Sequence, residues 1–197
     1  MSSIINASTS GGGGIIQTAD ASGILELQSG GVTKFTLNSS GVSYSGALVQ
    51  QVYTQTGAVA TGTTQTPYDD TIPQITEGNE FMTRTITPKS ATNILFIECS
   101  AFVSANPAAG YTITPALHQD AVAGALAAMP YYSTSDNGIA PLYLGHLMVA
   151  GGTSLITFRY RVGINAAATT TFNGQSAGSR RMGSVLSSFI RVTEIAV

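Results

Sequence analysis

The chain has 197 residues, of which 43% are hydrophobic and only 9% charged, and its net charge is -2. Soluble globular domains average about 25% charged residues, so uncharged Ser, Thr, Asn, Gln and Gly must cover the surface here, and these side chains suit strands and turns. The 8 Lys and Arg residues form no basic stripe, which argues against nucleic-acid binding, and no apolar stretch approaches the ~20 residues of a membrane-spanning helix.

The low charge also favours self-association. A chain with few ions loses little by burying surface against copies of itself. Its single cysteine, Cys99, excludes an intrachain disulfide and is expected to be a small buried core residue. The first residues lack the basic and apolar regions of a signal peptide, so we expect synthesis in a cytoplasm.

The N-terminal segment, residues 1–46, combines a polar lead-in with short strand patterns. Four consecutive glycines at 11–14 exclude a packed element, so residues 1–14 are expected to become ordered only on docking into a partner. Strands follow at residues 24–28, 33–37 and 42–45, separated by turn sequences. Three strands of this length bury too little apolar surface to stand alone, and two further copies of the segment would close a small prism.

Residues 47–76 are richer in Thr, Gln, Gly and Pro and contain few large hydrophobic residues. This composition predicts an extended linker or shaft, with room for an irregular strand at 47–53.

Residues 77–197 predict a domain of about eight strands, the number found in a jelly-roll sandwich. In one of these strands a period of two places Phe158 and Tyr160 on one face and Arg159 and Arg161 on the other. The predicted strands cover residues 81–87, 91–105, 111–119, 142–149, 154–162, 168–173 and 185–197.

Residues 120–130 admit two structures. Asp120 could cap a helix that Pro130 would end, and good helix formers lie between them. Alternatively the strand over 111–119 turns at 120–124 and returns over 125–133. We favour this hairpin, because Gly124 would interrupt the helix and strands are predicted on both sides.

Several phrases resemble bacteriophage virion proteins of the fibre and appendage class. The wording IIQTADASGILELQSGGVTKFTLNSSG (15–41) is similar to the sequence that precedes their fibre region. The phrases GNEFMTRTITPKSATNILFIECSAFVS (78–104), ALHQDAVAGALAA (116–128), TFRYRVG and SSFIRVTEIAV resemble a jelly-roll head that often follows it. Such heads are similar in outline to the trimeric sandwiches of the tumour necrosis factor and C1q type. The resemblance implies a homotrimer and also supports the hairpin.

Metal-binding chemistry is sparse. His118 and Asp120 are two positions apart and would share one face of a strand. Three copies of His118 on an axis could ring a metal ion, but two ligands from one chain are weak support for such a site. We therefore favour a polar strand end that solvent satisfies. His146, in an apolar run, is expected at an interface or accepting a backbone hydrogen bond.

Catalytic patterns are not apparent either, so the sequence predicts no catalytic residue, no enzyme activity and no cofactor. It contains no nucleophile elbow, zinc-protease motif or phosphate-binding loop. Its neighbouring acids are expected to be solvated turn carboxylates rather than the acid pair of a glycosidase. These acids are Asp69, Asp70, Glu77 and Glu80.

Binding surfaces are better represented. Tyr131 and Tyr132, followed by a loop with Asp136 and Asn137, combine rigid aromatic rings with polar groups, as glycan and protein contacts do. Arg180 and Arg181 could bind an acidic sugar, or pair with Glu98 or Glu194 of a neighbouring copy. We favour the ion pairs, because arginine commonly serves them.

Together these features predict an all-β homotrimer in three parts: a virion-docking β segment (1–46), a shaft (47–76) and a jelly-roll head (77–197). The expected function is that of a phage tail fibre or appendage, made in the host cytoplasm and carried on the virion. Its expected partners are other virion proteins and a host-surface glycan or protein. The alternatives are a purely structural neck, capsid-fibre or baseplate protein and, less favoured, a polysaccharide-degrading tailspike.

Overall fold

The computed structural model describes residues 24–38, 41–44, 46–175 and 177–197. The chain divides into two compact units, Met1–Ser45 and Gly46–Val197, and we call the second unit the head. In the described ranges no helix combines the length and hydropathy needed to span a membrane. The predicted lead-in at 1–14 lies outside the described residues.

The N-terminal unit contains a three-stranded antiparallel sheet in the order β1-β2-β3. The three strands predicted from the sequence are confirmed. Gly30 and Gly31 form the first turn with φ values of 62° and 76°, which favour glycine. Several large apolar side chains of this sheet remain exposed: Leu25, Leu27, Val32 and Leu37. The strands are β1 (Leu25–Ser29), β2 (Val32–Asn38) and β3 (Gly41–Ser43).

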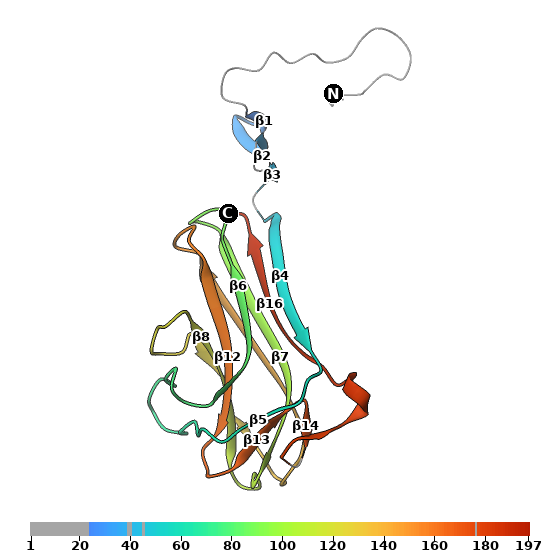
Figure 1. Cartoon of the computed structure of the whole chain (residues 1–197). Helices are drawn as coiled ribbons and strands as arrows, with labels where there is room; N and C mark the ends of the chain where they lie inside the picture. The colour runs from blue at the N-terminus through green and yellow to red at the C-terminus, as the bar shows by residue number, and fades with distance from the viewer. Residues whose placement is uncertain (1–23, 39–40, 45, 176) are drawn as a thin grey trace. The chain divides into compact units, whose positions relative to one another are not determined.

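The head is a sandwich of two antiparallel sheets (Figure 1). From β6 onward the long strands alternate between the sheets, so that β6, β8 and β12 lie in one and β7, β11 and β16 in the other, as in a jelly roll. The first sheet contains β4 (Leu48–Thr56), β5 (Ala60–Gly62), β7 (Ile94–Asn106), β11 (Ala140–Val149), β13 (Thr169–Phe172) and β16 (Ser188–Ile195). The second contains β6 (Asn79–Ile86), β8 (Thr112–Gln119), β9 (Ala127–Ala128), β10 (Tyr131–Tyr132) and β12 (Ile156–Ile164).

The core lies between the two sheets and follows the period-two pattern. In β7 and β16 every second residue is buried and its neighbours face outward. Phe158, Tyr160 and Val162 point into the core while Arg159 and Arg161 face outward, as predicted. Other fully buried side chains include Leu95, Ile97, Cys99, Ile113, Leu117, Leu142, Ile164, Phe172 and Ile190. The hairpin that the sequence favoured over a helix at 120–130 is confirmed, because β9 and β10 return along β8.

One carboxylate is fully buried at an end of the core. Glu194 accepts hydrogen bonds from the backbone of Lys89 at 2.7 Å and Ser90 at 3.3 Å. It also accepts them from the side chains of Asn93 at 2.6 Å and Gln50 at 2.5 Å. A buried charge is tolerated when several donors satisfy it, and here they fix the loop between β6 and β7.

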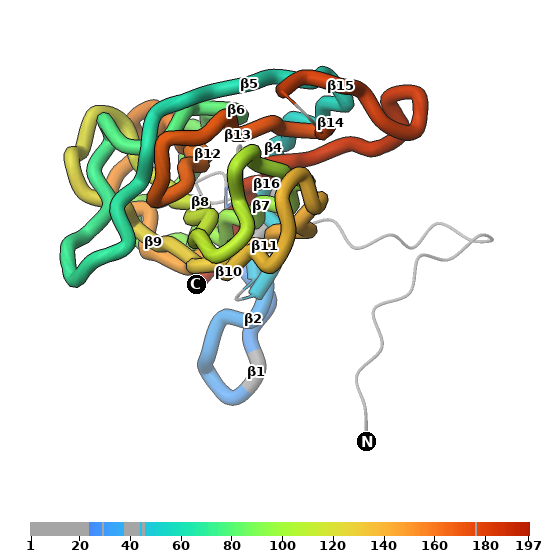
Figure 2. Tube along the Cα trace, turned by 90° about the horizontal axis from the view of Figure 1, so that it is seen from below, coloured from blue at the N-terminus to red at the C-terminus, as the bar shows by residue number. Residues whose placement is uncertain are grey.

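Within the region predicted as a linker or shaft at 47–76, the strand allowed at 47–53 is present and extends further, and the residues after it pack on the head. β4 is an integral strand that pairs with β16 over Thr56–Ser188 to Leu48–Ile195. After β5, the chain runs over the outside of the second sheet, and we call residues 63–77 the strap (Figure 2). The strap is fixed by backbone hydrogen bonds between Thr66 and Ile164 at 3.2 Å and between Ile75 and Ala123 at 2.7 Å. The polar composition of residues 63–77 thus belongs to a segment that packs on the sandwich and not to a free linker.

The head has two distinct ends along its strands (Figure 1). At one end the chain enters the head, where Gly46 donates a backbone hydrogen bond to Ala196 near the C-terminus at 2.8 Å. The other end carries loops 107–111, 133–139 and 173–187, and we call it the loop end. Two hairpin strands, β14 (Gly174–Gln175) and β15 (Ser179–Arg180), and the short 3-10 helix η1 (Met182–Ser184) belong to it.

Candidate functional site

The loop end brings together most of the residues that the sequence suggested for binding (Figure 2). Asp136 joins loops 133–139 and 107–111, because its Oδ1 accepts hydrogen bonds from the backbone of Ala108 at 2.6 Å and Ala109 at 2.9 Å. Gln175 then donates to the carbonyl of Asn137 at 2.7 Å, which links loop 173–187 to the same group. Segments far apart in the sequence thus form one continuous surface.

Asp136 and Asn137 serve this scaffold in the structure. The backbone donors hold the pKa of Asp136 below its ordinary value, so its carboxylate is ionised and committed to loop 107–111. Asn137 adopts a left-handed φ of 58° and donates its backbone N–H to Ala105 at 2.9 Å. Both residues therefore hold the loops of the loop end together.

Tyr131 and Tyr132 form β10 and pair with the first residues of β8. Both side chains are exposed, Tyr132 more than Tyr131. Directly beside them, the backbone N–H of Ser133 donates a hydrogen bond to the Tyr111 carbonyl at 2.9 Å. The tyrosines therefore lie next to the turn 107–111 that Asp136 organises.

Arg180 and Arg181 lie on the far side of the loop end, in the hairpin formed by β14 and β15. Arg181 donates to Gln175 at 2.6 Å, whereas Arg180 is exposed and makes no side-chain hydrogen bond with the described residues. The predicted pairing with Glu194 of a neighbouring copy is wrong, because that carboxylate is fully buried and saturated within its own chain. Glu98 also has a partner of its own, described below.

A second surface covers the outside of the first sheet, over β4, β16, β7 and β11, and we call it the uncovered face. Pairing in register brings outward residues into rows across the strands, for example Tyr53, Arg191, Glu98 and Gly145. Tyr53 is 63% exposed and Leu147 62% exposed, and single large apolar side chains are ordinary on a surface but a group of them on one face is not. The others on this face are Leu48, Phe96, Tyr143, Val149 and Phe189.

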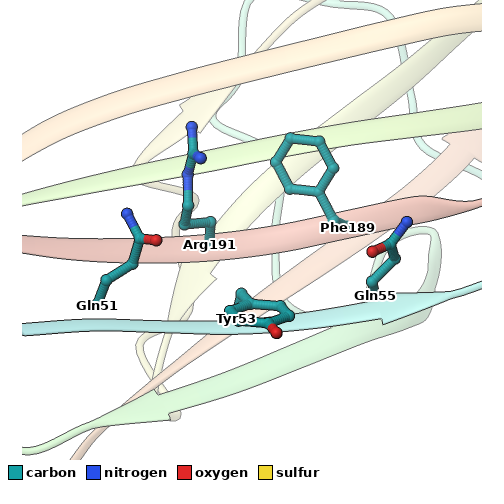
Figure 3. Close-up of a pocket in the computed structure, with 5 residues that line it drawn as sticks. All are labelled: Gln51, Tyr53, Gln55, Phe189 and Arg191. Atoms are coloured by element: carbon teal, nitrogen blue, oxygen red, sulfur yellow. The ribbon is translucent and has the colours of Figure 1, made fainter.

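A shallow depression of about 250 Å³ lies on the uncovered face between β4 and β16 (Figure 3). The ring of Tyr53 lies on one strand and that of Phe189 on the other. The Arg191 guanidinium lies 5.7 Å from the centre of the Phe189 ring, a cation–π distance. Gln51 and Gln55 complete the lining. The depression suits an apolar side chain with a polar edge.

A single ion pair lies in the middle of the uncovered face. Glu98 accepts hydrogen bonds from Arg191 at 2.6 and 2.9 Å and from the Tyr143 hydroxyl at 3.0 Å. Burial and the Glu98 carboxylate raise the pKa of Tyr143, which keeps it protonated as a donor. Glu98 and Arg191 are the outward-facing charged residues of these four strands.

The outside of the second sheet is different, because the strap and the turn after β8 cover part of it. Glu80 lies 3.1 Å from Arg159 and 3.6 Å from Arg161 in this layer. His118, beside Arg159 in the strand register, is fully buried, and its ring nitrogens have no hydrogen-bond partner among the described residues. The prediction of a solvated strand end is therefore wrong at His118, and its burial lowers its pKa.

The remaining candidates for chemistry are dispersed. Asp120 accepts a hydrogen bond from the backbone of Thr157 at 2.7 Å, and Glu77 accepts one from Gln74 at 2.9 Å. The described part of the chain contains no group of three His, Cys, Asp or Glu side chains that could hold a metal ion. His146 is half-buried on β11, and its burial lowers its pKa.

The uncovered face and the residues that connect the loop end were not predicted from the sequence. Gln175 was missed because an isolated glutamine in a loop carries no local pattern. Gln51 and Tyr53 fell within the irregular strand allowed at 47–53, but no alternation of polar and apolar residues there predicted which side chains would face outward.

Comparisons with known proteins give distant structural similarities. No family model and no curated protein matched this chain. Among solved structures, the Eiger TNF from S. frugiperda is similar over 74% of this chain and 93% of its own, with 12% identity and a TM-score of 0.41. The infectious bursal disease virus VP2 subviral particle is similar over 87% of this chain, with 9% identity and a TM-score of 0.32. This second alignment covers 43% of the viral chain.

Proposed function

We propose that this chain is a structural protein of a bacteriophage particle, a homotrimeric tail fibre or appendage that displays its head for attachment to the host surface. Its N-terminal segment docks to other virion proteins. The proposal rests on the wording of residues 15–41 and 78–104, on the uncovered face and on the position of the loop end. The uncovered face is the observation that carries it.

The uncovered face supports self-association because its composition suits burial. It combines large exposed apolar side chains with one ion pair that is already satisfied within the chain. Burial of apolar surface is the main driving force of protein association, and an unpaired charge would oppose it. Glu98 is paired in advance, so its burial between copies requires no further counter-ion.

Two parts of this face differ enough to fit each other. β11 is a free edge strand, and residues 140–155 contain no charged residue. A long uncharged edge is usually covered in a native assembly. The depression beside Tyr53 and Phe189 lies at the opposite side of the same sheet. A contact between the β11 edge of one copy and this depression of the next is heterologous, and three such contacts close a ring.

The ends of the head support the attachment role. The chain enters beside Ala196, so the loop end projects away from that connection. Three copies in one ring would present three loop ends in parallel. Weak contacts at each loop end then combine through their effective concentration.

Sedimentation of the purified full chain tests self-association. We expect a mass of three chains for the native protein. Val149→Asp and Leu147→Asp place a carboxylate on the uncovered face and should weaken association by about two orders of magnitude or more. Val122→Asp is the matched control, because Val122 and Val149 are both 54% exposed but Val122 lies in the turn after β8. A native chain that stays a stable monomer contradicts the proposal.

Antibody labelling of particles tests the location, and adsorption of purified protein to host cells tests attachment. We expect the antibody to label the particles and the purified protein to adsorb to host cells. Labelled particles whose protein never adsorbs would instead favour the purely structural neck, capsid-fibre or baseplate role.

A further inference from the structure

The loop end displays two arginines without a carboxylate partner, and we call residues 177–187 the arginine loop. Arg159, Arg161 and Arg191 each pair with a glutamate in the structure. Arg180 and Arg181 make no ion pair with any described residue. The loop also projects from the body of the head (Figure 2).

The backbone holds both arginines in one defined conformation. β14 and β15 pair Gly174 with Arg180, and a Cβ at Gly174 would come within 2.6 Å of the Ser179 carbonyl oxygen. Left-handed residues stand on each side of the pair, with φ values of 56° at Ala177 and 50° at Met182. Non-glycine residues adopt this conformation at a cost in conformational energy, which the surrounding structure must offset.

Side-chain contacts orient Arg181 further. Its Nε donates to Gln175 at 2.6 Å and its Nη1 to the carbonyl of Arg180 at 3.3 Å. Gln175 is itself fixed by its bond to Asn137. The Nη2 of Arg181 and the whole guanidinium of Arg180 have no hydrogen-bond partner among the described residues. Arg181 is thus oriented with Nη2 free to bind an anion, whereas the exposed Arg180 side chain would become ordered on binding.

The electrostatic surroundings favour an anion from outside the chain. In the sequence of loops 107–111, 133–139 and 173–187, Asp136 is the single acidic residue. Its carboxylate is already bound to Ala108 and Ala109. Glu98 and Glu194 are likewise occupied within their own chain. No acid of the loop end is therefore left to neutralise the arginine loop.

We infer that the arginine loop binds the carboxylate or phosphate groups of an anionic polysaccharide, an inference that rests on the proposed attachment function. Guanidinium groups bind both anions through paired hydrogen bonds. Two cations are too few for nucleic acid, whose binding depends on many phosphate contacts. Exposed Met182 and Val185 beside the arginines offer apolar contact to the faces of sugar rings. Repeated charges along a polysaccharide would engage several copies of the loop at once.

Retention of the full-length protein on immobilised polysaccharides tests the inference. Polygalacturonic acid supplies carboxylates, phosphorylated dextran supplies phosphates, and plain dextran is the neutral control. At about 50 mM salt we expect binding to one or both charged polymers and none to dextran. The comparison of the two charged polymers identifies the preferred anion.

Variants localise the binding. The double variant Arg180→Gln/Arg181→Gln should weaken it about tenfold or more, with sedimentation unchanged. Lys89→Gln removes an exposed cation from the other end of the head and should change it less than about twofold. Equal losses in both variants, no binding to either charged polymer, or equally strong binding of duplex DNA overturn the inference. A native protein that sediments as a monomer overturns the proposed function instead. Cell adsorption that is unchanged in the double variant overturns the inference alone.

Discussion

The two outer faces of the head sandwich treat charge in opposite ways. The second sheet carries Arg159, Arg161 and Glu80, and the strap runs along this charged layer and covers part of it. The uncovered face of the first sheet carries mainly apolar side chains with one ion pair. In an isolated chain, the charged layer would be expected outside and the apolar layer beneath a cover.

In the proposed assembly, this contrast would let the chain pack its own strap on one face and leave the other for copies of itself. Charges under the strap form pairs and backbone hydrogen bonds, for example from Arg161 to the carbonyls of Glu77 at 3.0 Å and Gly78 at 2.8 Å. The strap is thus fixed by the polar groups it covers. Apolar side chains on the other face are satisfied only by burial.

Displacement of the strap should have the largest effect on the stability of the head. A Cβ at Gly163 would lie 2.7 Å from the backbone nitrogen of Thr66, so Gly163→Ala forces the strap outward. We expect a loss of about 1–3 kcal/mol in the free energy of unfolding, measured by urea denaturation. Gly152→Ala is the control, because a Cβ there has open space, and it should be neutral. Equal stability of the two variants would show that the strap is not closely packed.

The same substitution, Glu→Gln, can be made in the ion pair of each face, and its effect on stability compared. Glu80→Gln leaves two partly exposed arginines beside the strap without a carboxylate and should cost about 1 kcal/mol. Glu98→Gln, in the Val149→Asp background where the face is open to water, should cost less than about 1 kcal/mol. Thermal denaturation measures both variants. A larger loss for Glu98→Gln would mean that the uncovered face is the more highly organised of the two.

Acid should lower the free energy of unfolding through His118 in the second sheet. His118 faces Arg159, Arg161 and Glu80, and burial holds its pKa below the ordinary value of 6.5. The unfolded chain therefore binds the proton more readily, so stability is complete above about pH 6.5 and falls as the pH drops towards the lower folded pKa.

Urea midpoints at about pH 7.5 and about pH 5 measure this loss. His118→Gln should reduce the difference between the two midpoints. The control His146→Gln should leave most of it, because His146 is only half-buried. An unchanged difference in His118→Gln would assign the acid sensitivity to other groups.

The sequence predicted those parts of the fold in which a local pattern follows burial. The alternation of Phe158, Arg159, Tyr160 and Arg161 identified which face of β12 meets the core, and the buried Cys99 was also correct. The meander β1–β3 followed from its turn sequences. In these segments each residue's environment depends on its own strand.

The remaining features depend on contacts between distant segments. β4 looks like linker sequence because its inward side includes Gln50 and Thr54, and its partner β16 lies more than 130 positions later. The burial of His118 requires the turn after β8, whose path no local pattern encodes. Tyr131, Tyr132, Asp136 and the arginine pair were found by residue type, but their common location required the structure.

The position of β16 sets a condition on how this protein can be made. This strand lies between β4 and β7 and pairs with both, although it follows every other described strand in the chain. Translation must therefore pass residue 195 before β4 has a strand to pair with. A message or polypeptide truncated before that point leaves the sheet split at its centre, so prematurely ended products lack the surface on which neighbouring copies would be recruited.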